Sequence, residues 1–262
     1  MKPLDRARLK LRRANYHVNL LLDVVEEFNK LDLCRVAVEQ NDERQAILRV
    51  YDVRPTPPEW GVLIGDCAHN LRSALDHIAY GLARPHFYPD PVPTTVQFPI
   101  FRWRWWYRGE RGRRGAASQM RGFPRGARTA VEQLQPYHHW KWPETWLLWQ
   151  LAEISNVDKH RLLHVTNVSA IGTRLSFEPV GASVIEQEVI PGPIKDGAIL
   201  ARLKFGPRNP RYVKVNAEIA ALEMFDEGSP ESIQGHRVTG TLGAISNFIR
   251  DEVIPRFERF FP

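Results

Sequence analysis

Apolar residues repeat with the period of an α-helix between Glu59 and Ala83, and polar residues occupy the opposite side of this segment. At about 100° per residue the apolar side chains form one stripe, as in a helix that faces a core. That stripe contains Leu63, Ile64, Cys67, Leu71, Ala74, Leu75, Ile78 and Leu82. The opposite side, called the polar stripe below, contains Asp66, His69, Asn70, Ser73, Asp76, His77 and Tyr80, with Arg72 at its edge. Since it lacks the Lys and Glu typical of a solvated face, we expect it to take part in chemistry or to contact another polar helix.

Helical and extended patterns succeed one another along the rest of the chain. Apolar residues at helical spacing predict further helices at 5–31, 127–134, 143–154 and 238–260. Alternating β-branched residues predict a hairpin within 34–53 and about four strands between 165 and 218, and a short edge strand is expected at 96–101. These patterns predict an α+β fold, with a helical bundle beside an antiparallel β-sheet that includes the hairpin. We expect a single domain spanning 1–262, with an arginine- and tryptophan-rich insertion at about 101–128.

Composition excludes several classes of protein. The 262 residues are 43% hydrophobic, enough for a substantial core. No apolar run approaches the roughly 20 residues that span a bilayer, and the charged first segment does not resemble a signal peptide. Two cysteines, Cys34 and Cys67, are too few for a disulfide framework or a cysteine-based zinc site. We therefore expect a cytoplasmic protein with no membrane partner.

Positive charge is concentrated in the insertion. The net charge of the chain is +6, and between Arg102 and Arg128 nine arginines stand against one acid, Glu110. Arginine binds phosphate and aromatic faces stack on unpaired bases, so this composition is typical of contact with single-stranded RNA. The candidate nucleic-acid-binding residues here are Arg102, Arg104, Trp105, Arg108, Arg111, Arg113 and Arg114. The alternative is a flexible, glycine-rich loop that its tryptophans anchor to the core.

A second dense group of polar residues lies between Glu153 and His164. If one helix continues through this stretch, Glu153, Asn156, His160 and His164 fall within about one third of its circumference. Lys159 could then engage phosphate, and we expect this line of residues to face the polar stripe. Alternatively, Asn156 caps a helix end.

One segment of the polar stripe resembles a known motif. Arg72-Ser73-Ala74-Leu75-Asp76-His77 is similar to the R-x4-H motif of HEPN-like helical proteins. Many HEPN-like proteins are metal-independent ribonucleases of toxin, defence or RNA-processing systems, and they pair two motifs across a homodimer. The longer string G-D-x-x-H-N-L-R-S-A-L-D-H, with a later N-x-D-K-H, also resembles a recurrent pattern in uncharacterised bacterial proteins. Arg72 and His77 are five residues apart, about 140° around a regular helix, so a second subunit or a distorted helix would be needed to bring both to one phosphate.

The resemblance implies an endoribonuclease that cleaves single-stranded RNA by transesterification from the 2′-hydroxyl. His77 would serve as base or acid and Arg72 would hold the phosphate. Asp76 and Asn70 would orient these groups, and His160 is a further catalytic candidate. The implied partners are RNA, a second copy of the chain and an antitoxin, and no cofactor is expected.

Two other functions remain open. Asp66 and His69 have the i, i+3 spacing of carboxylate–histidine metal ligands in helical bundles, and His77, Glu153 and His160 could complete such a set. Alternatively, the chain is a non-enzymatic RNA-binding or scaffold protein whose polar stripe is a buried structural network.

Overall fold

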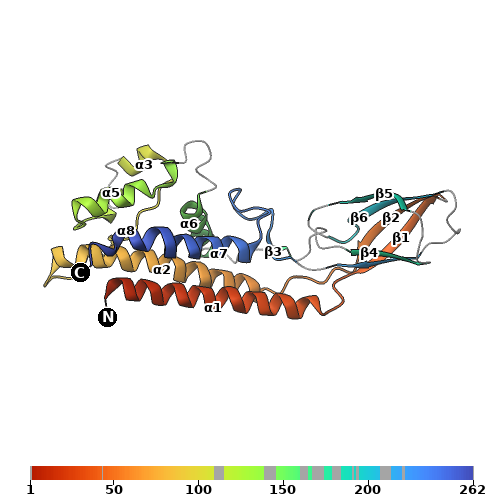
Figure 1. Ribbon diagram of the computed structural model, residues 1–262, viewed down its shortest axis with the longest axis horizontal. Coiled ribbons are helices and arrows are strands. Elements are labelled where there is room, and N and C mark those ends of the chain that lie inside the picture. The colour runs from red at the N-terminus through yellow and green to blue at the C-terminus, as the bar shows by residue number, and fades with distance from the viewer. Residues whose placement is uncertain are drawn as a thin grey trace.

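Helices occupy one end of an elongated molecule and the larger β-sheet occupies the other (Figure 1). The computed structural model describes residues 2–42, 44–108, 115–138, 146–159, 165–166, 174–178, 184–190, 192, 195–206, 214–219 and 222–261. Within these residues the predicted α+β fold, with its antiparallel sheet, is confirmed. No helix of the described chain is both long and apolar enough to cross a membrane.

Two long helices, α1 (Pro3–Asn29) and α2 (Glu59–Phe87), run antiparallel along the helical end (Figure 1). Pro3 suits the first turn of α1, where a backbone N–H has no helical partner. Helix α2 also packs against α6 (Leu147–Asp158) and α7 (Val238–Phe248), and α7 contacts α1 as well. The helix predicted at 238–260 is interrupted, because the π-helical turn η5 (Ile249–Val253) joins α7 to α8 (Ile254–Glu258).

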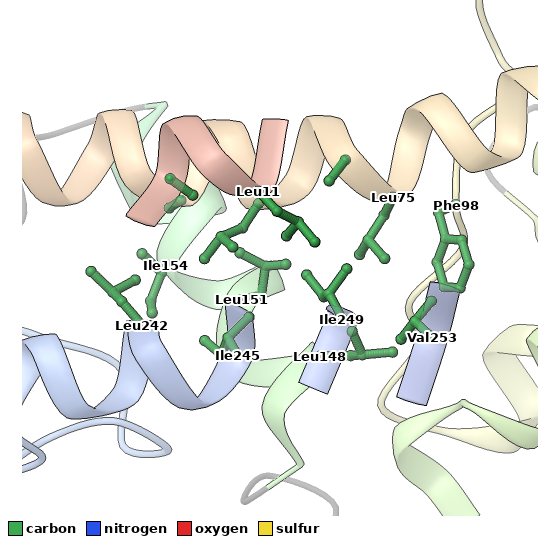
Figure 2. Close-up of a cluster of buried hydrophobic side chains, with 14 of the residues drawn as sticks. Leu11, Leu75, Phe98, Leu148, Leu151, Ile154, Leu242, Ile245, Ile249 and Val253 are labelled. Atoms are coloured by element: carbon green, nitrogen blue, oxygen red, sulfur yellow. The ribbon is translucent and has the colours of Figure 1, made fainter. Parts of the chain in front are cut away.

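Aliphatic side chains of α1, α2, α6, α7 and η5 meet in the core of the helical end (Figure 2). Leu11 of α1, Leu75 of α2, Leu151 of α6, Leu242 of α7 and Ile249 of η5 are each at most 5% exposed. Each such side chain contributes about 1.5–3 kcal/mol relative to full exposure. The apolar stripe of α2 thus faces this core, as its spacing predicts.

Among the described residues, eight strands form three sheets at or near the other end. The largest has the order β1-β2-β6-β5, all neighbours being antiparallel: β1 (Arg35–Asp42), β2 (Gln45–Tyr51), β6 (Ile199–Phe205) and β5 (Val184–Val189). Two smaller sheets each hold one antiparallel pair: β4 (Arg174–Glu178) with β7 (Lys214–Glu218), and β3 (Val165–Thr166) with β8 (Met224–Phe225). Phe177 of β4 meets Phe205 of β6 edge to face at 6.3 Å, so the β4–β7 pair packs on the larger sheet.

Three expectations need correction. The predicted strand at 96–101 is wrong, because these residues are irregular and place Phe98 in the helical core. In the part of the chain that the structure describes, the strands do not join into a single sheet around the hairpin, since β4 and β7 pair only with each other there. The helix expected from about Pro143 begins at Leu147 and ends at Asp158. Residues 160–164 lie outside the described chain, so the helical line expected as far as His164 stays a prediction.

The insertion at 101–128 is helical in part. It contains α3 (Arg104–Arg108), α4 (Ala116–Gln119) and the start of α5 (Arg125–Gln133). Arg111, Arg113 and Arg114 lie outside the described residues. The described chain has two separate hydrophobic clusters, one in the helical end and one in the sheet. The single domain stays a prediction.

Candidate functional site

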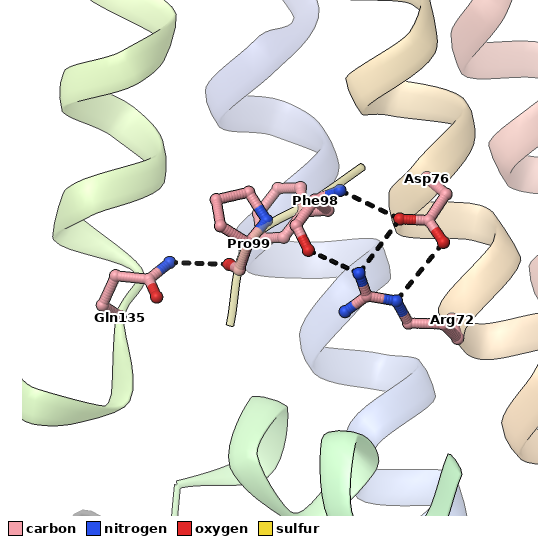
Figure 3. Close-up of polar contacts among 5 residues, drawn as sticks. All are labelled: Arg72, Asp76, Phe98, Pro99 and Gln135. Atoms are coloured by element: carbon pink, nitrogen blue, oxygen red, sulfur yellow. Dashed lines mark hydrogen bonds and ion pairs between the residues drawn. The ribbon is translucent and has the colours of Figure 1, made fainter. Parts of the chain in front are cut away.

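Arg72 and Asp76, one turn apart on α2, hold the irregular segment 97–101 by its backbone (Figure 3). The Arg72 guanidinium donates to both carboxylate oxygens of Asp76, Nη2 to Oδ1 at 3.2 Å and Nε to Oδ2 at 3.3 Å, and Nη2 also donates to the Phe98 carbonyl at 2.6 Å. The Phe98 amide donates to Asp76 Oδ1 at 2.9 Å. The backbone amide and carbonyl of Phe98 are therefore both paired with side chains of α2. In a β-strand they would instead be paired with the backbone of a neighbouring strand.

The same segment is held from its other side by Gln135, which is fully buried just after α5. Its side-chain amide donates to the Pro99 carbonyl at 2.9 Å (Figure 3), and its Oε1 accepts from the Phe101 amide at 3.0 Å. The Gln97 amide donates to the Gln119 carbonyl at 3.1 Å. Segment 97–101 is thus fixed between α2 and the helices of the insertion.

A cleft of about 340 Å³ lies between this segment, α2 and α6. Its lining includes Arg72, Phe101, Trp149, Glu153, Ser155 and Lys159. Glu153 accepts a hydrogen bond from the Ser232 hydroxyl. Trp149 Nε1 and Ser155 Oγ are buried and have no hydrogen-bond partner among the described residues. The cleft therefore offers two unused polar groups beside two cationic side chains.

The other edge of the polar stripe faces α1. Asn70 donates to the Asp66 carbonyl at 2.7 Å and accepts from Lys10 Nζ at 3.4 Å. The pKa of His77 is lowered, first by burial and then by the charges of Lys10 and Arg6, with Asp76 opposing. Burial and the two cations of α1 thus act on the pKa of His77 in the same direction.

A third group of titratable side chains lies where α1, α2 and α6 come together. His17 Nδ1 is buried, has no hydrogen-bond partner in the described structure and lies 4.0 Å from Asp66 Oδ2. The pKa of His17 is lowered, chiefly by burial. Asp158 lies against Gly65, and the pKa of its carboxyl is raised by burial and by Asp66, while His69 opposes this effect.

These positions bear on the predicted site residues. Arg72 shares the cleft with Glu153, Asn156 and Lys159, whereas Asn70 and His77 are in contact with or close to cations of α1. The polar stripe is thus divided between two surfaces of α2. Among the residues that the structure describes, no three His, Cys, Asp or Glu side chains are grouped so that they could hold a metal ion. His160, a member of both the catalytic and the metal-ligand predictions, lies outside those residues.

Helix α3 presents the aromatic and basic residues of the insertion to solvent. Trp105 and Trp106 are 62% and 43% exposed and contact each other edge to face at 4.9 Å. Arg104 and Arg108 are also exposed, and Arg108 lies 3.6 Å from Glu132. Just before α3, the Arg102 guanidinium lies 4.9 Å from the Trp103 ring and 6.0 Å from the Trp149 ring. Arg102 thus connects the insertion to the cleft.

Sequence reasoning missed Gln135, Trp149, Ser155 and His17. Trp149 and Ser155 belong to a helix whose apolar pattern indicates a core element, and a lone glutamine or histidine gives no periodic signal.

Comparisons of this chain with family models, curated proteins and solved structures found no match.

Proposed function

We propose that this protein binds single-stranded RNA along the exposed face of α3 and into the neighbouring cleft. The observation that carries the proposal is the position of Arg102, between Trp103 at the start of the insertion and Trp149 in the cleft. Alternating cations and aromatic rings bind a strand without regard to its sequence, because every nucleotide has a phosphate and a stacking face. The proposed RNA contacts on this surface are Arg102, Arg104, Trp105, Arg108 and Lys159.

The contacts of Arg72 with Asp76 and Phe98 favour RNA binding over RNA cleavage. Two of its nitrogens are engaged by Asp76 and Phe98, and its side chain is 18% exposed. A phosphate would have to compete with these contacts. In addition, α2 is helical without a break from Glu59 to Phe87, so Arg72 and His77 stay about 140° apart within one chain.

Cleavage of RNA is a second candidate, and the surroundings of His77 favour it. A neutral histidine can accept the proton of a 2′-hydroxyl, and Lys10 and Arg6 supply positive charge close to it. In this arrangement the cations of α1 would hold the phosphate, which is the role that the HEPN-like motif gives to Arg72. The homodimer and the antitoxin partner that the resemblance implies stay predictions.

A binding titration with a fluorescent single-stranded oligoribonucleotide tests the proposal. Trp105→Ala should weaken binding by about 1–3 kcal/mol, the usual loss for one stacked base. Arg104→Gln with Arg108→Gln should weaken binding and reduce the slope of log K against log salt by roughly 0.7 for each lost phosphate contact. Arg202→Gln, an exposed arginine of the distant sheet, is the matched control. The proposal fails if the wild-type protein does not retain the strand at low salt, or if Arg202→Gln weakens binding as much as the α3 variants.

The same RNA, incubated in EDTA and analysed on a denaturing gel, tests cleavage. If cleavage occurs, His77→Gln should slow it by about 10²- to 10⁴-fold, as loss of a proton-transfer group does, while binding is kept. If the RNA stays intact after incubation with the wild-type protein, with and without divalent ions, cleavage is refuted and RNA binding is the only proposed function that stands.

A further inference from the structure

We infer that the cleft between α6 and segment 97–101 is a subsite for one unstacked nucleotide. This inference rests on the proposed function, since it names what part of the bound strand occupies the cleft. The volume of about 340 Å³ is at the lower end of the roughly 300–1,000 Å³ of small-molecule sites. It suits a single nucleotide and is too small for a stretch of stacked bases.

The unpaired polar groups of α6 indicate that the occupant has hydrogen-bonding edges. Ser155 is 7% exposed, and its hydroxyl has no partner among the described residues, although a serine within a helix commonly bonds to the carbonyl one turn earlier. The indole N–H of Trp149 is likewise buried and unpaired in that part of the chain. Buried donors in native proteins are nearly always paired. Ring nitrogens and carbonyl oxygens of a nucleobase, or the hydroxyls of a ribose, would pair them.

Charge in the cleft suits a phosphate at its rim. Lys159 is exposed at the end of α6 and makes no ion pair within the described chain, so its ammonium is available to an anion. Arg72 adds positive charge on the α2 side, although its guanidinium is shared with Asp76. The only carboxylate among the cleft residues that the structure describes, Glu153, is hydrogen-bonded to Ser232. A nucleotide carries both a base and a phosphate. It therefore matches the polar groups and the positive charge of the cleft better than an uncharged nucleoside does.

The position of the cleft relative to α3 explains how a strand would reach it. The Arg102 guanidinium lies over the rings of Trp103 and Trp149, which places a cation between the exposed face of α3 and the cleft. Segment 97–101, which forms one wall, is held by Arg72, Asp76 and Gln135. This wall is therefore already in place before any ligand binds, and little ordering of the backbone opposes binding.

Titration with guanosine 5′-monophosphate, followed by two-dimensional NMR of the tryptophan indole groups, tests the inference. The Trp149 resonance is identified by its loss in Trp149→Phe, which keeps an aromatic ring. We expect the nucleotide to shift this resonance, and Ser155→Ala or Lys159→Gln to weaken the binding by about two- to tenfold, the usual effect of one lost hydrogen bond. Ser73→Ala on α2 and Lys195→Gln near the sheet are matched controls and should bind as the wild type does.

The outcomes separate the subsite from RNA binding as a whole. If the wild-type protein binds the oligoribonucleotide but the nucleotide leaves the Trp149 resonance unchanged and Ser155→Ala binds RNA normally, the subsite is refuted while the proposed function stands. If inorganic phosphate shifts the resonance as much as the nucleotide does at the same concentration, the base is not recognised and the subsite is also refuted. If the nucleotide binds in the cleft but α3 variants bind RNA as tightly as the wild type, the subsite stands and the proposed path along α3 fails.

Discussion

The two polar edges of α2 differ in how their side chains are used. On the edge near segment 97–101, Arg72 and Asp76 bond to each other and to both backbone groups of Phe98. On the edge near α1, Asn70 receives one long hydrogen bond from Lys10, and His77 has a lowered pKa beside two cations. The difference teaches that residues of one short motif can hold a neighbouring segment on one side of a helix, while another residue of the motif lies beside the cations of a second helix.

Replacing Asp76 should have the largest effect on stability. Asp76→Ala leaves the Arg72 charge, which is 18% exposed, without its partner and removes the acceptor of the Phe98 amide. We expect a loss of about 2–4 kcal/mol in the free energy of unfolding, measured by urea denaturation. Asp66→Ala, on the side of α2 near α1, should cost less than about 1 kcal/mol, because that carboxylate is 56% exposed and 4.0 Å from His17. Equal losses would show that the two edges do not differ.

A smaller effect is expected at Gly65, where α2 and α6 touch. A β-carbon there would lie 2.0 Å from Asp158 Oδ1 and 2.6 Å from its Cγ, so the aspartate side chain must rotate away. We expect Gly65→Ala to destabilise the wild-type protein by about 1 kcal/mol, despite the better helix propensity of alanine. In an Asp158→Ala background the same change should instead stabilise the protein by up to about 1 kcal/mol. Thermal unfolding of the four variants of this cycle measures the coupling, and additive effects would contradict the contact.

The smallest effect concerns the pKa of His77 on the edge near α1. Lys10→Gln removes one of the cations that lower this pKa, so the value should rise toward the ordinary value of about 6.5. An NMR pH titration of the histidine ring resonances measures the change. His17 is an internal control, because its pKa is lowered by burial and by Arg13 but not by Lys10. An unchanged His77 titration would show that Lys10 does not act on it.

The same shifts set the sign of the pH dependence of stability. Because the folded pKa values of His17 and His77 are below the unfolded value, the unfolded chain binds more protons than the folded chain as the pH falls through about 6.5. The free energy of unfolding should therefore decrease as the pH is lowered from 7.5 toward the folded pKa values. Lys10→Gln should reduce this decrease.

Most of the secondary structure could be predicted from the sequence, because periodicity reports which side of an element is buried. The helical spacing from Glu59 onward and the alternation around the hairpin both led to the observed elements. Strand partners could not be predicted in this way. Alternation in β4 and β7 says which face is apolar, but their pairing with each other depends on the course of the chain between them.

The candidate site could be predicted only in part. The polar stripe identified the important helix, and the i, i+4 spacing of Arg72 and Asp76 already allows an ion pair. Their function is decided by the backbone of Phe98, which lies 22 residues beyond Asp76 and carries no local sign of that contact. Ser155 and Trp149 could not be identified from the sequence, because only the structure shows that their polar atoms are buried without partners among the described residues.

One hydrogen bond of the bundle joins two helices that are synthesised at very different times. Ser246 of α7 donates to Asn15 of α1 at 2.7 Å, across 231 residues of sequence. At roughly 5–20 residues per second, α7 leaves the ribosome about 10–50 s after α1. During that time the apolar faces of α1 and α2 lack the helix that covers them, so the growing chain exposes the surface that chaperones recognise. The bundle can close only after the whole sheet has been made.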